Sequence, residues 1–403
     1  MNKVEEKLLE AFSCAVRKKK CSLSSMNSEE SLRFFHLAMN HMLLPMAVEA
    51  IEEKERFPYY VKRAKEAAQT QACRSADFVL LYDYLLEKGL KPLVIKGIVC
   101  RSLYPHPEER CSSDEDLWID SEAYPALHEA LLAYGLKLVD SNQNIEESFE
   151  VTYEEKESHL YIEVHKTLFP PSSAYSYLNA YFENAQEKAI AERIYRTGFY
   201  TLSHTDHLLY LILHAFKHFL HSGFGIRQVG DILLYSISYQ NDIEWSRLQE
   251  DLRDARAFDL SRAIYKIGMN RIINDKDLRD VLKDWDIDAI DENKLLEDIM
   301  QSGIYGASSL SRLHSSTMTI NAINRKSPTS ILSSVFLPLS SMENKYQYLK
   351  KRPYLLPIAW ISRVVVYLKE TRNMAQNDPQ ESIRLGKKRI ELLKEYKILE
   401  EES

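Results

Sequence analysis

The sequence predicts an α+β fold in which a small mixed sheet lies between extensive helical regions at both ends of the chain. Apolar residues recur at helical spacing through the first ninety residues, short strand-like runs alternate with helical runs up to about residue 200, and helical spacing then returns. At 403 residues the chain is long enough for two or more domains. We therefore expect a helical region over 1–90, a core over 91–200 and a second helical region over 201–403.

The N-terminal region reads as three helices. Apolar residues from Val4 to Lys18 follow helical spacing, and Asn27 with Glu30 forms a capping-box pattern that opens a second helix through about Met46. A long charged amphipathic stretch, Tyr59 to Lys88, predicts the third.

The core alternates strands with helices. Its expected strands are Leu93–Ile95, Asp114–Ile119, Leu136–Val139, Phe149–Tyr153 and His159–His165, with a short helix after Gly97 and another near Tyr124–Tyr134. This mixture predicts a small sheet with helices packed on one face. Further along, residues 305–341 are rich in serine and read as a linker or an irregular surface segment, and Ser382 to Tyr396 reads as a charged helix.

The stretch RCSSDEDLWID, Arg110 to Asp120, places Asp114 and Asp116 two residues apart at the start of an apolar strand. Side chains at i and i+2 share one face of a strand, about 6.6 Å apart. Two such carboxylates suit Mg²⁺, which takes oxygen ligands and is usually bound by one or two carboxylates plus substrate phosphates. The pattern therefore points to phosphoryl or nucleotidyl transfer, with a solvated acidic strand edge as the alternative.

Two neighbouring motifs support a site at these acids. The run KPLVIKG ends in Lys96 and Gly97 before a short helix, so backbone N–H groups and a lysine can meet an anion there, although a plain turn would look the same. The alternating run HLYIEVHK puts Glu163 and His165 on one face and its apolar residues on the other. Glu163 is thus a third candidate carboxylate.

A histidine-rich helical face follows in the C-terminal region. His214, Lys217, His218 and His221 fall at i, i+3, i+4 and i+7, which is one side of a helix. Three histidines so placed could bind zinc, but Lys217 would repel a dication and no acid nearby completes the ligand set. Ordinary helix packing with surface histidines is the other explanation of the pattern. Further along, Arg227 and Asp231 stand at i and i+4 and are spaced to pair with each other.

Three acids on two strands after a strand–glycine–helix resemble the DNA polymerase β-like nucleotidyltransferases and, more narrowly, their uncharacterised bacterial nucleotidyltransferase family. The resemblance covers nearly the whole chain. The matching residues are Lys96-Gly97, Tyr104-Pro105, Arg110, Asp114-Glu115-Asp116-Leu117, Glu163 with His165, His214, Lys217-His218, Arg227, Asp231 and the tail from Asn344 to Trp360.

This resemblance implies a polymerase β-like sheet and metal-dependent transfer of a nucleotidyl group from an NTP, most naturally ATP, to a hydroxyl acceptor with release of pyrophosphate. It implies two Mg²⁺ ions, roughly 3.5–4 Å apart as in other two-metal sites. The implied metal ligands, which also carry the catalysis, are Asp114, Asp116 and Glu163. The implied nucleotide or acceptor contacts are Lys96, Gly97, Arg110, His165, His214, Lys217 and His218, with His165 alternatively orienting Glu163.

The sequence departs from the superfamily pattern at two places. Ile98 follows Gly97 where serine is common, and sixteen residues separate Gly97 from Asp114, so Lys96 or Arg110 must supply the missing phosphate contact. Glu115 stands between the acids where an apolar residue is usual; we expect it to face a partly solvated side or to perturb the strand. These departures keep open a rival function, a non-catalytic nucleotide-binding or scaffold protein.

The composition of the chain limits the kinds of acceptor and the compartment that we expect. The formal net charge of −7 argues against a general nucleic-acid binder and favours a small-molecule or protein acceptor. The five cysteines show no CxxC spacing, which indicates neither a disulfide framework nor a zinc ribbon. The N-terminus lacks the apolar run of a signal peptide, and the apolar stretch near Leu355–Leu368 is too short to span a bilayer and contains Pro357 and Arg363. We expect a cytoplasmic protein without membrane contact.

Overall fold

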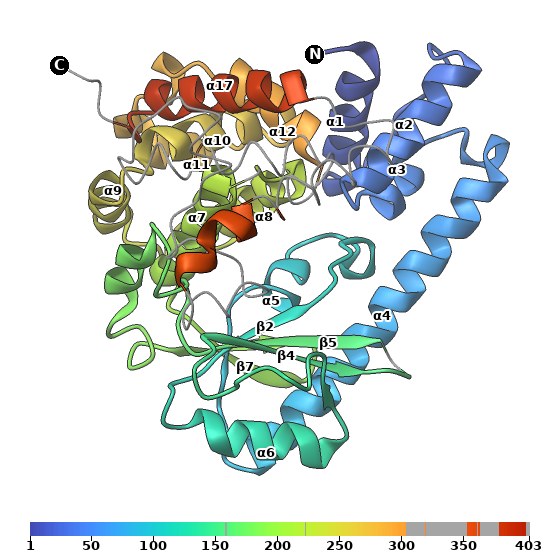
Figure 1. Cartoon of the computed structure of the whole chain (residues 1–403). Coiled ribbons are helices and arrows are strands. Elements are labelled where there is room, and N and C mark those ends of the chain that lie inside the picture. Colours follow the sequence, from blue (N-terminus) through green and yellow to red (C-terminus); the bar gives the residue numbers. More distant parts are fainter. Residues whose placement is uncertain are drawn as a thin grey trace.

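The computed structural model describes residues 1–157, 159–221, 223–303, 319, 353–360, 362 and 379–399. Within these residues the chain has the predicted α+β architecture, with a five-stranded mixed sheet, a two-stranded sheet and many helices. Figure 1 shows the sheets and helix α6 in the lower part of the molecule and the C-terminal helices above them, beside α1–α3. The expected linker over 305–341 lies outside the described residues except for residue 319, and the tail of the resemblance is described only from residue 353.

The five-stranded sheet has the order β1-β2-β5-β4-β3. Strands β2 and β5 pair in parallel, whereas β1–β2, β4–β5 and β3–β4 pair in antiparallel fashion. The parallel pair lies in the interior of the sheet, so both strands are fixed by ladders on each side. The strands are β1 (Leu93–Val94), β2 (Glu115–Trp118), β3 (Lys137–Leu138), β4 (Glu150–Glu155) and β5 (Leu160–His165).

The N-terminal helices follow the predicted order with one difference. The capping box of Asn27 and Glu30 is present, but the helix that it opens stops at Asn40 instead of continuing to Met46. Met42 has a positive φ of 55°, and Pro45 stands at the start of the next helix, where its lack of an N–H is harmless. The helices are α1 (Lys3–Val16), α2 (Ser28–Asn40), α3 (Leu44–Ala50) and α4 (Pro58–Glu87).

A hairpin that the sequence pattern did not indicate extends the core. Its strands, β6 (Ile190–Ile194) and β7 (Thr197–Thr201), lie against the edge strand β1, where the Thr201 hydroxyl donates to the Val94 carbonyl over 2.6 Å. Phe199 of β7 stacks on Phe78 of α4 with ring centroids 5.8 Å apart. The outward side chains of β6 are exposed or half-buried, so its sequence lacks the apolar signal of an interior strand.

The C-terminal helices pack on the core rather than apart from it. One continuous hydrophobic core includes residues from Val4 to Ile398, so both expected boundaries, at 90 and 200, lie within packed structure and the three-part division remains a prediction. The expected helix over 382–396 corresponds to α17. The helices are α7 (His204–His221), α8 (Ile226–Ser238), α9 (Trp245–Asp254), α10 (Phe258–Arg271), α11 (Lys276–Val281), α12 (Asn293–Ser302) and α17 (Pro379–Glu395).

The two faces of the sheet have different covers. Helix α6 (Tyr124–Tyr134) lies on the apolar face, where the hydroxyl of Tyr153 on β4 meets the Tyr124 hydroxyl and His128 Nδ1, each at 2.7 Å. Helices α7 and α8 lie over the opposite face (Figure 1). The short helix after Gly97 is α5 (Ile98–Arg101), and the 3₁₀ turns are η1 (Lys54–Arg56), η2 (Pro107–Glu109), η3 (Ser176–Phe182), η4 (Lys283–Trp285), η5 (Ile287–Ala289) and η8 (Pro353–Leu355). In the part of the chain that the structure describes, no helix combines the length and apolarity needed to cross a membrane.

Candidate active site

The parallel pairing of β2 with β5 brings acidic side chains together. Asp116 is the register partner of Glu163, and Trp118 is the partner of His165. One ligand atom from each of Asp116, Glu163 and His165 lies within 4.8 Å of the others. Among the described residues, these three form the group with metal-ligand spacing.

Asp116 is buried and carries two cationic or hydrogen-bonding neighbours. Its Oδ1 lies 3.0 Å from Lys96 Nζ and 3.2 Å from His165 Nε2. Burial alone would raise the pKa of Asp116, but the charge of Lys96 and the hydrogen bond from His165 outweigh it and hold the pKa well below its ordinary range. Asp116 is therefore a carboxylate at neutral pH.

Lys96 connects the acid to the histidine-rich helix α7. Its Nζ also lies 3.1 Å from His214 Nε2. Burial, and then the adjacent Lys96 charge, lower the pKa of His214 well below its ordinary value, so this imidazole is neutral and accepts from the ammonium.

Glu163 has the opposite electrostatic character from Asp116. Its side chain is 29% exposed. Burial, followed by the negative charges of Asp116, Asp114 and Glu150, raises its pKa to about 8. A carboxyl group in this position becomes anionic at neutral pH only when a cation compensates its acidic neighbours.

His165 lies between the acids and is buried. Its Nε2 is 3.2 Å from Asp116 Oδ1 but 4.0 Å from Glu163 Oε2, and its Nδ1 is 3.4 Å from Glu150 Oε2. The ring therefore contacts Asp116 more closely than Glu163. The sequence had suggested the alternative that His165 orients Glu163 instead of contacting a ligand.

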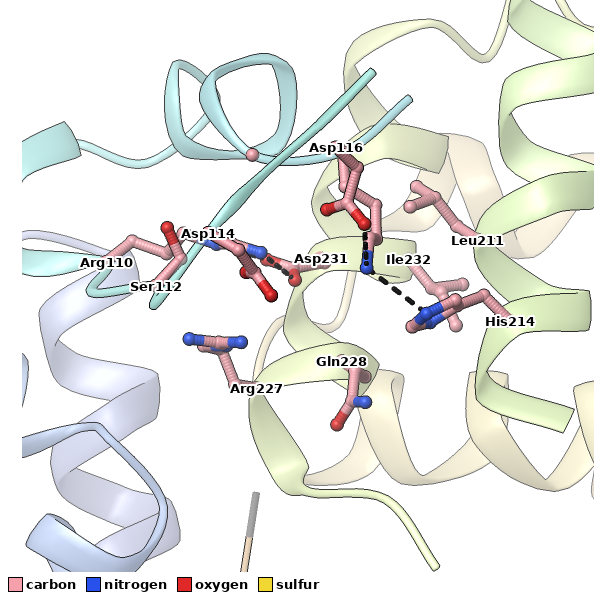
Figure 2. A pocket seen from close by; sticks show the side chains of 12 residues that line it. Arg110, Ser112, Asp114, Asp116, Leu211, His214, Arg227, Gln228, Asp231 and Ile232 are labelled. Carbon is pink, nitrogen blue, oxygen red and sulfur yellow. Dashed lines mark hydrogen bonds and ion pairs between the residues drawn. The ribbon is translucent and has the colours of Figure 1, made fainter. Parts of the chain in front are cut away.

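Asp114 stands just before the first paired residue of β2 and is partly exposed. Because no ladder holds it, its carboxylate is placed by the preceding loop, outside the close group of Asp116, Glu163 and His165. Figure 2 shows this carboxylate pointing into a pocket beside Asp116.

The histidine-rich face of α7 meets the site in the middle of the helix, at His214, rather than along its whole length. The rings of His214 and His218 are 4.5 Å apart, and Lys217 has a lowered pKa because of burial and then the nearby Lys96. His221 points elsewhere, since its Nε2 meets the Tyr175 hydroxyl at 2.7 Å. The structure therefore does not gather the three histidines of this helix into a zinc site.

Glu115 corrects an expectation from the sequence. It is 2% exposed, pairs within the sheet opposite Ile162 and forms a buried ion pair with Arg101. Its Oε2 accepts from the Ile98 N–H at 2.8 Å, at the start of α5. Glu115 therefore neither faces solvent nor perturbs the strand, because Arg101 and the α5 amide compensate its charge.

Gly97 is required by this arrangement. Its φ is +49°, and a Cβ added there would lie 1.9 Å from Glu115 Oε2. The backbone at the end of β1 thus approaches a protein carboxylate as closely as only glycine permits.

Arg110 is engaged by a residue far along the chain. Its Nε and Nη2 donate to the two oxygens of Asp231 at 3.1 and 2.6 Å, and the Tyr104 hydroxyl donates to the same carboxylate at 2.9 Å. Asp231 pairs with Arg110 rather than with Arg227, whose Nη1 donates to the Cys111 carbonyl. This network joins the loop before β2 to helix α8.

The pocket lies between the core and helices α7 and α8, as Figure 2 shows. It contains most of the residues predicted for nucleotide and metal binding. It also adds polar side chains that were not predicted as ligand contacts: Arg227 was named as part of the family pattern and as a possible partner of Asp231, and Ser112 and Gln228 carry no motif. The lining residues are Lys96, Gly97, Arg110, Ser112, Asp114, Asp116, Leu211, His214, Arg227, Gln228, Asp231 and Ile232.

A family model described as uncharacterised nucleotidyltransferase matches residues 27–267, from α2 into α10. This match spans more than half of the chain and includes the pocket and the acidic strands. The chain therefore belongs to this uncharacterised nucleotidyltransferase family and is a nucleotidyltransferase by class, as the motifs predicted. Searches of curated proteins and of solved structures find no match.

Proposed function

We propose that the protein transfers a nucleotidyl group from an NTP to a hydroxyl group of a small-molecule or protein acceptor in a metal-dependent reaction that releases pyrophosphate. The observation that carries this proposal is the register of β2 and β5, which sets Asp116 against Glu163 with His165 beside them. The family membership supports the reaction class.

The donor atoms fit a divalent cation. Two carboxylates supply the hard oxygen ligands that Mg²⁺ prefers. Burial and then the negative charges of its acidic neighbours raise the pKa of Glu163, and a cation bound between these acids would offset that repulsion. Asp116 and Glu163 would hold the metal and Asp114 would reach a second ion, while His165 keeps the Asp116 carboxylate in place. Bound Mg²⁺ would screen the phosphate charge and lower the pKa of the acceptor hydroxyl.

Lys96 has a clear task in this scheme. Its ammonium pairs with the Asp116 oxygen that a metal ion would bind. When the metal and nucleotide bind, the ammonium would leave this oxygen and turn toward a phosphate oxygen. Phosphoryl transfer depends mainly on positioning and on compensating charge, and Lys96 supplies such a charge next to the reacting group.

Glu163 is the proposed proton acceptor. Without a cation, burial and then its acidic neighbours raise the pKa of Glu163 to about 8. A bound cation would lower this pKa, so that Glu163 would be anionic and able to accept a proton from an acceptor hydroxyl. Its side chain is also the more exposed of the two acids in the ladder pair, at 29% against 3% for Asp116, which supports the proposal that it meets the acceptor.

We take ATP as the first NTP to test and the cytoplasm as the site of action. The net charge of −7 disfavours nucleic acid as the acceptor, because binding to phosphate backbones relies on lysine and arginine.

The test measures nucleotide transfer and metal dependence together. The protein is incubated with each NTP labelled at the α-phosphate, Mg²⁺ and a cell extract, and labelled product and pyrophosphate are measured. Asp116→Asn should lower transfer about a thousandfold, equivalent to about 4 kcal/mol, and should remove the rise in Tm that Mg²⁺ and ATP produce together.

Asp120→Asn is the matched control, because Asp120 follows β2 but is exposed and lies outside the pocket. Equal transfer by the wild type and Asp116→Asn would refute the assigned site. Nucleotide binding without Mg²⁺ dependence and without any labelled product would instead support the non-catalytic nucleotide-binding alternative.

A further inference from the structure

The N-terminus of α5, where the sequence places a phosphate cradle, is filled by the protein itself. The Glu115 carboxylate accepts from the Ile98 N–H at 2.8 Å and pairs with the buried Arg101. A phosphate at the same position would meet this carboxylate, and two anions in one buried place repel each other. The triphosphate of a nucleotide therefore needs another anchor.

The second expected anchor, Arg110, is also engaged. The Nε and Nη2 of its guanidinium donate to the two oxygens of Asp231, and the Tyr104 hydroxyl donates to the same carboxylate. A buried bidentate pair of this kind is strongly held, since breaking it would leave an uncompensated charge. We regard Arg110 as a positioning residue that fixes the loop before β2 against α8.

A different arginine in the pocket keeps donors available. Arg227 is 4% exposed and lines the pocket together with Asp114 and Asp116. Its Nη1 donates to the Cys111 carbonyl, while its buried Nε has no hydrogen-bond partner among the described residues. Figure 2 shows its guanidinium in the pocket, on the side away from His214.

Arg227 also stands at a favourable place on its helix. It is the second residue of α8, a helix of thirteen residues whose N-cap, Gly225, has no side chain to cap the first-turn amides. The Gln228 N–H donates to the Gly225 carbonyl at 3.1 Å, and the helix dipole adds positive potential at this end, where the Ile226 and Arg227 N–H groups lie. The arginine and the helix terminus thus favour an anion at the same point.

We propose that Arg227 and the first turn of α8 bind the β- and γ-phosphates of the NTP. This inference rests on the proposed function and adds the side from which the triphosphate enters. In this protein the anion site has moved from the glycine at the end of β1 to the start of α8, because Glu115 occupies the first position. The arginine fork would grip two phosphate oxygens and stabilise the departing pyrophosphate.

The experiment measures dissociation constants for ATP, AMP and inorganic tripolyphosphate by calorimetry in Mg²⁺. Arg227→Gln should raise the Kd for ATP and for tripolyphosphate about tenfold to a hundredfold, which is the range for losing hydrogen bonds to a charged group, and should leave the Kd for AMP unchanged. Arg227→Lys should fall between wild type and Arg227→Gln, because it keeps the charge but not the fork.

Arg74→Gln is the matched control. Arg74 makes the same kind of bond, from Nη1 to the Ser112 carbonyl at 3.1 Å, and it too has a buried Nε without a partner, but it does not line the pocket. It should lose a similar amount of Tm and bind ATP as the wild type does. If Arg227→Gln does not fold, the dissociation constants of Arg227→Lys are compared with those of Arg74→Gln instead.

The outcomes separate this inference from the proposed function. Unchanged ATP and tripolyphosphate binding in the Arg227 variants, with transfer intact in the wild type, would overturn the anion site alone. Equal weakening by Arg74→Gln would also overturn it, since the effect would then come from the loop. Arginine-dependent tripolyphosphate binding without nucleotide transfer would support the anion site and count against the proposed function.

Discussion

The two faces of β2 carry neighbouring acids with different roles. Glu115 points to the buried side, where Arg101 and the α5 backbone compensate it within a rigid environment. Asp116, the next residue, points to the pocket, where its main partner is Lys96 on a long and partly exposed side chain. Adjacent carboxylates of similar burial are therefore structural on one face and chemically available on the other.

The nature of the partner explains this difference. A fully buried arginine cannot leave its carboxylate without losing both hydrogen bonds and charge compensation. A lysine at the edge of a pocket, with His214 as a second partner, can turn away when another cation arrives. Changes on the Glu115 side should therefore affect folding, and changes on the Asp116 side should affect chemistry or its pH dependence.

The largest expected effect is on the Glu115 face. Glu115→Ala leaves Arg101 buried without its charge partner, which should lower the free energy of unfolding by about 3–5 kcal/mol. Denaturant unfolding followed by circular dichroism measures the change.

A double variant sharpens this test. Replacing both charges, in Glu115→Leu with Arg101→Met, should recover much of the lost stability, because an apolar pair leaves no buried charge. Glu147→Ala, at an exposed acid, is the control and should change little. A Glu115→Ala variant as stable as this control would show that the pair is not structural.

The second-largest expected effect is at Gly97, whose lack of a side chain lets the Glu115 carboxylate approach the backbone. Gly97→Ala places a Cβ 1.9 Å from Glu115 Oε2 at a φ of +49°, so it combines a clash with backbone strain. We expect a loss of about 2–4 kcal/mol in the free energy of unfolding.

Gly135→Ala is its matched control, since Gly135 also has a positive φ, +119°, but a Cβ there meets nothing within 4 Å. It should lose only the strain, about 1 kcal/mol. Equal losses of unfolding free energy in Gly97→Ala and Gly135→Ala would show that the close contact between Glu115 and the end of β1 does not contribute to the cost of the Gly97 substitution.

The smallest expected effect is on the pocket face and depends on pH. The pKa of Glu163 rises from 4.5 to about 8 on folding, so the folded protein binds this proton more tightly than the unfolded chain. The resulting stability is fully present below pH 4.5 and is lost as the pH rises through about 8. Glu163→Gln should remove this dependence.

Relative to the wild type, the stability of Glu163→Gln should rise between pH 5 and pH 9 by on the order of 2 kcal/mol in metal-free buffer. Urea unfolding at several pH values measures this difference, with Glu147→Gln as the control at an exposed acid. Parallel pH profiles for the wild type and Glu163→Gln would contradict the crowding of acids around Glu163.

The sequence by itself determined the elements with strong local patterns. Helical spacing and the capping box identified α1, α2 and α4, and alternation identified β5 with Glu163 and His165 on its polar face. The Asp-x-Asp-Leu motif located the acidic strand, and the resemblance led to the right family. These features depend on interactions between residues close together in the chain, which periodicity and motif spacing record.

Other features were decided by tertiary structure. The hairpin of β6 and β7 is fixed by its contacts with β1 and α4, and the membership of His165 in the acidic group depends on the register of β2 with β5. The partner of Arg110 is Asp231, which is 121 residues away in the sequence. The sequence spacing had suggested Arg227 as the partner of Asp231, but Arg227 lines the pocket. Glu115 is buried and its charge is compensated by Arg101 and the Ile98 N–H, although its position in the motif suggested a partly solvated face or a perturbed strand. A one-dimensional pattern states which side chains share a face, but only packing brings distant faces together and so decides which charges are paired and which remain for a ligand.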